Sequence, residues 1–105
     1  MKQLPVLSLV IIFLSACATH QPAEQISPNF FGHYELLTAA DRDAILQTAI
    51  PRASAILPGS QIETVKVFTG TEVDAAFTKG IDGPTGSLYL QKIEGKWKIT
   101  IEDKP

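Results

Sequence analysis

Cysteine and histidine are scarce in this chain. Its 105 residues include one cysteine, Cys17, and two histidines, His20 and His33. A single thiol cannot form an intrachain disulfide, and neither histidine has His, Cys or carboxylate neighbours at metal-ligand spacing. We therefore expect no disulfide, no metal site and no cofactor, and we expect His33 to have a surface or packing role.

Motifs of common enzyme classes are also missing. The chain has no Gly-x-Ser-x-Gly elbow, and the stretch GPTG at residues 83–86 lacks the Gly-Lys-Ser of a phosphate loop. Asp41 and Asp43 are two residues apart, so on a helix they lie on different faces and most simply favour the helix dipole. These absences predict that the protein is not an enzyme.

Positive charge is not concentrated in any segment. Lys and Arg number 9 against 11 Asp and Glu, which gives a formal net charge of −2. Proteins that bind nucleic acid carry a basic patch or stripe, because phosphate contacts dominate their affinity. We expect no nucleic-acid partner.

The longest apolar run is too short to cross a bilayer. It extends from Leu4 to Leu14, interrupted by Pro5 and Ser8, whereas a membrane-spanning helix needs about 20 apolar residues. Lys2 precedes the run and small residues follow it. This pattern is typical of a secretory signal peptide.

The end of this run carries a more specific motif. Leu14, Ser15, Ala16 and Cys17 resemble the lipobox of bacterial lipoproteins, and a chance match within an ordinary signal peptide is the alternative. The resemblance implies cleavage between Ala16 and Cys17, which removes residues 1–16. It also implies a diacylglyceryl thioether on Cys17 and an acyl chain on the new N-terminus.

The same resemblance implies a location in the cell envelope. Two or more acyl chains hold a protein stably on a membrane, whereas one chain holds it marginally. In the sorting rule of this family, aspartate after the cysteine favours the inner membrane, and the residue here is Ala18. The expected place is the outer membrane, facing the periplasm.

Residues 17–35 have the composition of a flexible tether, with proline, glycine and small polar residues throughout. Phe30, Phe31 and Tyr34 complicate this interpretation. They either dock on the folded domain, where their burial would contribute a few kcal/mol, or contact lipid or a partner.

A small domain is expected from residue 36 to residue 105, beginning with a helix. Thr38 and Asp41 have the spacing of a capping box. One apolar stripe follows at spacings of three, four and seven: Ile45, Leu46, Ala49, Ile50, Ala53, Ile56 and Leu57. Pro51 lies inside this stripe, so we expect a kink or a division into two short helices.

The spacing of apolar residues then changes to two, which predicts strands. Residues 61–69 and 72–79 are rich in Val, Ile, Thr and Phe, and a two-residue turn joins them. With that turn, Phe68 lies opposite Val73. These residues predict the first hairpin.

Residues 87–93 and 96–102 predict a second antiparallel hairpin around Glu94 and Gly95. Its pairing sorts nearly all apolar residues to one face, and Leu88 lies opposite Ile101.

Lys92 is the exception on that apolar face, where it lies opposite Trp97. We expect its aliphatic stem to lie along the indole, with the ammonium at the edge of the sheet.

One amphipathic helix and four antiparallel strands predict an α+β fold, in which the N-terminal helix packs on a curved sheet. Residues 88–102 (LYLQKIEGKWKITIE) are similar to the closing hairpin of nuclear-transport-factor-2-like and cystatin-like domains. This resemblance covers about 15 residues, supports the fold class and implies no catalytic residue.

The preferred function is a small structural or protein-interaction lipoprotein of the envelope. Its expected surface is the polar face around Tyr89, Gln91 and Lys98, and its expected partner is an envelope protein or peptidoglycan.

Two alternatives require a cavity. An apolar ligand of the kind bound by nuclear-transport-factor-2-like domains would lie in a cavity lined by Phe68, Phe77, Leu88 and Trp97. A small enzyme would also need a buried ionisable group, for which the candidates are Lys92, Lys66 and Glu63. A helix packed flush on the sheet excludes both, whereas a ligand site needs several hundred Å³.

Overall fold

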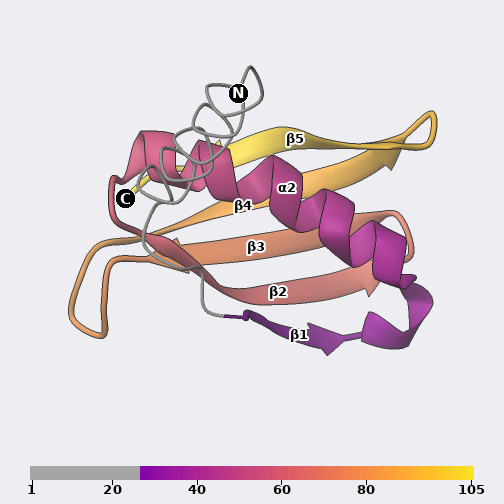
Figure 1. Cartoon of the computed structure of the whole chain (residues 1–105), viewed down its shortest axis with the longest axis horizontal. Coiled ribbons are helices and arrows are strands. Elements are labelled where there is room, and N and C mark those ends of the chain that lie inside the picture. The colour runs from indigo at the N-terminus through magenta and orange to yellow at the C-terminus, as the bar shows by residue number, and fades with distance from the viewer. Residues whose placement is uncertain (1–26) are drawn as a thin grey trace, which may run out of the picture.

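The computed structural model describes residues 27–105, so Ala16, Cys17 and His20 lie outside the described residues. Two layers are present, one helix and one sheet (Figure 1). The elements are β1 (Asn29–Gly32), the 3-10 helix η1 (Tyr34–Leu36), α2 (Ala39–Ile56), β2 (Gln61–Thr69), β3 (Glu72–Thr78), β4 (Thr85–Ile93) and β5 (Lys96–Asp103). The predicted α+β class is confirmed. No helix within the described range is long and apolar enough to cross a membrane.

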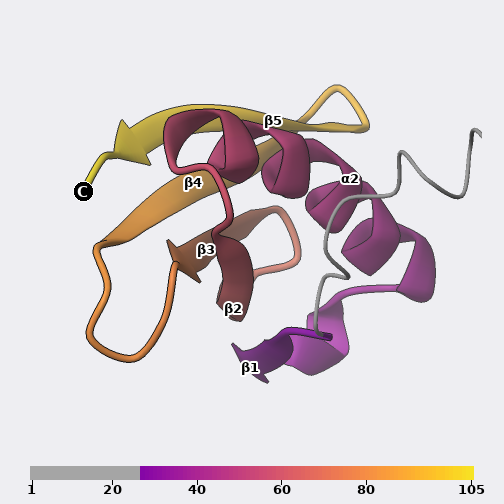
Figure 2. The ribbon, with the colours of Figure 1, turned by 60° about the vertical axis from the view of Figure 1, so that its left-hand side comes forward.

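The sheet has five strands in the order β1-β2-β3-β4-β5. The three later pairs are antiparallel, and β1 pairs with β2 in parallel. Figure 2 shows α2 on one side of this curved sheet, and no helix or strand of residues 27–105 covers the other side. The expectation of four antiparallel strands after an N-terminal helix is wrong in its strand count, since the sheet has five strands, and in two further respects. The sheet is mixed, and α2 follows β1.

The additional strand comes from residues 17–35, where the sequence predicts a tether. Phe30 packs against the core, whereas Phe31 and Tyr34 are 40% and 51% exposed. Gly32 ends the strand with φ +84°, and a Cβ there would lie 2.7 Å from the Val67 carbonyl oxygen. The proline and glycine that indicated a tether thus flank or end an edge strand.

The helix begins as predicted. Thr38 Oγ1 accepts a hydrogen bond from the Asp41 amide at 3.0 Å, and Asp41 Oδ2 accepts one from the Thr38 amide at 3.1 Å. The helix then continues through Pro51 to Ile56, so the expected division into two helices does not occur. Ala49 and Ala53, on either side of the exposed proline, are buried against the sheet, and this packing holds the helix together where one hydrogen bond is missing.

In the first hairpin, Val67 on β2 lies opposite Val73 on β3. The register of these two strands shifts at two places, between Ile62 and Thr64 and between Val67 and Thr69. The predicted pairing of Phe68 with Val73 is wrong. A β-bulge adds one residue to β2 and turns Phe68 to the open face, where it is 41% exposed. Phe68 therefore cannot line a cavity under the helix.

In the second hairpin, Lys92 lies opposite Trp97 as predicted, but Ile101 lies opposite Tyr89 instead of Leu88. The register shifts between these two pairs because β5 contains an additional residue there. Ile101 consequently points away from the core and is 61% exposed.

The core lies between α2 and the sheet and is filled by side chains. Phe77, Leu88, Leu90 and Ile45 are each 0% exposed, and Trp97 is 7% exposed. Every buried side-chain nitrogen or oxygen of residues 27–105 has a hydrogen-bond partner. The helix is thus packed flush on the sheet.

Gly86 shows how closely this core is packed. It lies opposite Phe77, and a Cβ at Gly86 would come 2.5 Å from Phe77 Cζ and 2.8 Å from the Asp103 carbonyl oxygen. We expect Gly86→Ala to lower the free energy of unfolding by about 1–3 kcal/mol, because the ring or the strand must move. Urea unfolding measures this loss.

Gly70→Ala is the matched control, because the nearest atom to its added Cβ is the Leu36 carbonyl oxygen at 3.5 Å, an ordinary contact. Equal effects of the two substitutions would contradict this explanation of Gly86.

Candidate functional site

The open face of the sheet carries one continuous row of side chains across all five strands. Direct cross-strand partners place Phe31, Lys66, Asp74, Tyr89 and Ile101 side by side. On β2, β3 and β4 the neighbours of these residues are buried and point to the core, since successive side chains of a strand lie on opposite faces. We call this surface the open face.

The structure brings the three predicted surface residues together on the open face. Gln91 on β4 lies directly opposite Lys98 on β5, and Tyr89 lies two residues along β4. Lys98 is exposed, whereas Tyr89 and Gln91 are partly buried by their neighbours.

Glu72 on β3 joins this group, although the sequence analysis did not identify it. The Tyr89 hydroxyl donates a hydrogen bond to Glu72 Oε2, and Gln91 Nε2 donates to the same oxygen at 3.5 Å. The hydrogen bond to this carboxylate, followed by burial, raises the pKa of the Tyr89 phenol. Pairing of β3 with β4 puts Glu72 opposite Gln91. A prediction of the register between these two strands would have identified Glu72 as a member of this group.

An aromatic pair lies beside this group. The rings of Phe68 and Tyr89 have centroids 6.2 Å apart and are tilted by 55°, a separation at which aromatic rings interact favourably. Lys66 Nζ lies 5.3 Å from the centre of the Phe68 ring, within the range of a cation–π contact. These contacts hold apolar rings in fixed positions on an exposed surface.

The open face is acidic near the end of β5. Burial raises the pKa of Asp74, the nearby charge of Asp103 raises it further, and Lys66 opposes both effects. Two carboxylates that repel each other make this corner a place where an added positive charge would be favourable.

A second cluster ties the helix to the last hairpin. Asp41 Oδ1 accepts hydrogen bonds from Lys92 Nζ at 2.9 Å and from Trp97 Nε1 at 3.2 Å. The pKa of Asp41 lies well below its usual range. The main cause is the hydrogen bond from Lys92, and burial acts in the opposite direction. The Lys92 ammonium, expected from the sequence to lie at the sheet edge without a partner from the helix, is paired in the structure with a carboxylate of α2.

The three ionisable candidates for an enzyme lie in separate places. Lys92 pairs with Asp41, Lys66 lies over Phe68 on the open face, and Glu63 lines a hollow at the far end of β2. His33 is exposed, with Nδ1 3.7 Å from Glu35 Oε1. Within residues 27–105, no group of three or more His, Cys, Asp or Glu side chains could hold a metal ion.

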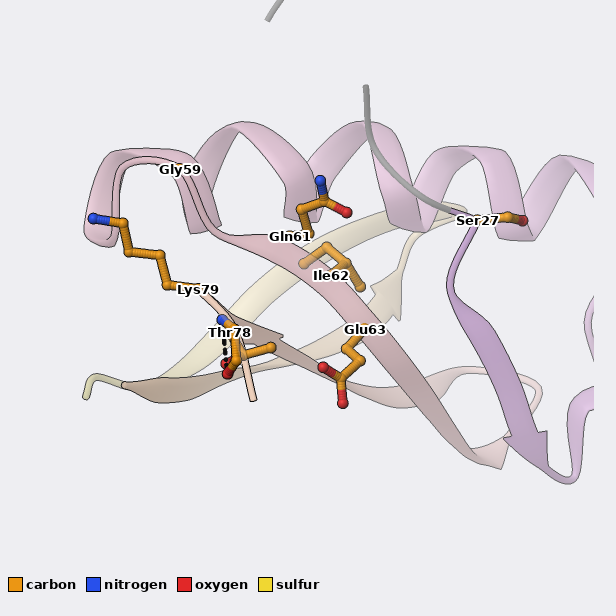
Figure 3. Close-up of a pocket in the computed structure, with 8 residues that line it drawn as sticks. Ser27, Gly59, Gln61, Ile62, Glu63, Thr78 and Lys79 are labelled. Carbon is orange, nitrogen blue, oxygen red and sulfur yellow. Dashed lines mark hydrogen bonds between the residues drawn. The ribbon is translucent and has the colours of Figure 1, made fainter. Parts of the chain in front are cut away.

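The hollow beside Glu63 has a volume of about 310 Å³. Its lining includes Gln61, Ile62, Thr78 and Lys79, and in Figure 3 the charged ends of Lys79 and Glu63 point in different directions. It lies outside the interface between helix and sheet. A second, smaller hollow of about 210 Å³ touches Phe77 and the loop after β3.

Of the four residues predicted to line an apolar cavity, Phe77, Leu88 and Trp97 belong to the packed core and Phe68 lies on the open face. None of the four lines the larger hollow.

Comparison of this chain with protein-family models, with curated proteins and with solved structures finds no match.

Proposed function

We propose that this chain is a lipid-anchored protein of the bacterial envelope whose folded domain binds another envelope protein through its open face. The anchor rests on the resemblance of Leu14 to Cys17 to a lipobox. The expected location is the outer membrane, facing the periplasm.

The observation that carries the interaction role is the composition of the open face. Phe31, Phe68 and Ile101 are 40%, 41% and 61% exposed, and polar groups lie between them, notably Tyr89, which is hydrogen-bonded to Glu72. Protein interfaces typically combine aromatic and aliphatic contacts with polar contacts.

A ligand-binding role is the second candidate, and only the hollow beside Glu63 favours it. Its volume of about 310 Å³ is at the lower limit of ordinary ligand sites. It lies at one end of β2 and not under the helix. We propose no enzymatic activity, because Lys92, Lys66 and Glu63 do not converge within the described residues.

The lipid anchor is tested by replacing Cys17, the residue to which the lipid would be attached. We expect Cys17→Ser to abolish incorporation of labelled palmitate and to leave the chain at full precursor length, because the thioether cannot form. Ser8→Ala, a change within the apolar run and outside the motif, serves as the control and should leave labelling unchanged. Labelled Cys17→Ser protein would show that the anchor assignment is wrong.

The interaction face is tested by crosslinking in membranes of the host. A photoreactive amino acid at position 98, on the open face, is expected to give one discrete adduct with an envelope protein other than a second copy of this chain. The same group at position 47, on the exposed side of α2, is the control and should give none. Adducts from both positions, or recovery of the position-98 product with peptidoglycan, would contradict a protein partner on the open face.

A further inference from the structure

The last strand leaves an edge of the sheet unpaired by any strand in the described part of the chain. β5 lies at the end of the strand order and has β4 on one side only. It has 8 residues, whereas β1 at the opposite edge has 4. Short edge strands are one of the ways in which proteins avoid pairing, and a long one presents a row of backbone donors and acceptors.

The two ends of β5 carry side chains of opposite charge on its exposed positions, positive near the start and negative at the end. Lys96 and Lys98 lie near its start and Asp103 at its end, all exposed. Among residues 27–105, neither Lys98 nor Asp103 belongs to an ion pair. Edge lysines discourage unspecific pairing, but an antiparallel copy of the same strand would bring an acidic end to this basic end. A parallel copy would place like charges together.

The bulge in β5 decides which face these charges occupy. In a regular strand, residues five apart lie on opposite faces. Here the register shift adds one residue, so that Lys98 lies opposite Gln91 and Asp103 lies opposite Ser87, both on the open face. Lys98 of one copy and Asp103 of another can therefore meet on the same side of a joined sheet.

The neighbouring carboxylate, Glu102, is already occupied. Arg52 on α2 donates two hydrogen bonds to it, from Nε at 2.5 Å and from a terminal nitrogen at 2.8 Å. This pair lies on the helix side. Asp103 is thus the β5 carboxylate left for an incoming lysine, and its repulsion of Asp74 would be relieved by one.

We propose that β5 binds β5 of a second copy of this chain in antiparallel orientation, joining the two sheets into one, with Lys98 of each copy opposite Asp103 of the other. The two-fold axis then passes between Thr100 and Ile101. The two Ile101 side chains lie beside each other next to this axis and bury each other. In the single chain, Ile101 is 61% exposed.

Charge reversal in the full chain, purified in detergent, tests this dimer. Sedimentation should show a monomer–dimer equilibrium, and Lys98→Glu or Asp103→Lys alone should weaken it about tenfold, because each creates two like-charge contacts per dimer. The double substitution restores opposite charges and should return the dimer constant to near the original value. Asp82→Lys, in the exposed loop between β3 and β4, is the control and should have no effect.

Disulfide formation gives a second readout that does not depend on charge. In the proposed register, cysteines at position 101 of the two copies fall within the Cα separation that a disulfide accepts. Ile101→Cys should oxidise to a covalent dimer, and Asp82→Cys should not. Both variants retain Cys17, so a product formed through Cys17 would appear in both.

A chain that sediments as a monomer at every concentration would overturn the proposal. So would a double charge reversal that stays as weak as the single variants. Neither result bears on lipidation, which the palmitate label reports separately, so failure of the dimer and failure of the anchor are distinguishable.

Discussion

Asp41→Ala is expected to lower the free energy of unfolding by about 3 kcal/mol, because it removes a helix cap together with the acceptor of a partly buried ammonium and of a buried indole N–H. Asp41 is 8% exposed. Its carboxylate accepts hydrogen bonds from the Thr38 amide, from Lys92 Nζ and from Trp97 Nε1. The substitution therefore removes a helix cap and leaves a buried indole N–H without its acceptor.

Urea unfolding followed by tryptophan fluorescence measures this loss directly, because Trp97 is the only tryptophan. Asp43→Ala is the matched control, since Asp43 is an exposed carboxylate in the same turn of α2, and its loss should stay below about 0.5 kcal/mol. Equal losses for the two variants would mean that Asp41 acts only through the helix dipole.

The same carboxylate predicts a dependence on pH. The Lys92 hydrogen bond is the main cause that lowers the pKa of Asp41 in the folded state. A group whose folded pKa is depressed contributes its full stability above its unfolded pKa, about 3.9 for aspartate, and loses that contribution as the pH falls further. The difference between the original chain and Asp41→Ala should thus be constant near neutral pH and shrink below about pH 4. A difference that grows on acidification would contradict the depressed pKa.

Trp97→Ala is expected to cost about 3–5 kcal/mol, as truncations of large aromatic residues in cores do. Trp97 is 7% exposed and belongs to the core cluster under α2. Trp97→Phe keeps an aromatic ring but removes the N–H that Asp41 accepts, and should cost less, about 1–3 kcal/mol. Chemical denaturation followed by circular dichroism measures both. A loss below about 1 kcal/mol for Trp97→Ala would be far too small for a core aromatic and would place Trp97 at the surface.

The elements that could be predicted from the sequence are those specified by neighbouring residues. The capping box at Thr38 depends on residues three apart. The turn of the last hairpin was predictable because Gly95 readily adopts the positive φ that a two-residue hairpin turn favours. In the structure, Glu94 and Gly95 have φ values of 52° and 80°. Lys98 fell beside Gln91 because that pairing lies between the turn and the bulge.

What could not be predicted depends on residues far apart in the chain. β1 pairs in parallel with β2 across about 35 positions, and a strand of four residues has too little periodicity to be recognised. Two of the three register shifts, at Phe68 in β2 and at Thr100 in β5, occur where nothing local requires them, which is why Phe68 and Ile101 were assigned to the wrong face. The contacts of Asp41 with Lys92 and Trp97 span 51 and 56 positions, so a residue recognised as a helix cap proved also to fix the last hairpin.

The measurement that tests the account most directly is a mass spectrum of the protein isolated from the cell that makes it. Since the proposed role requires a domain held at a membrane, the account predicts an N-terminal peptide that begins at Cys17 and carries the mass of a diacylglyceryl group and an additional acyl chain. A peptide in which residues 1–16 are retained and Cys17 is a free thiol would contradict it.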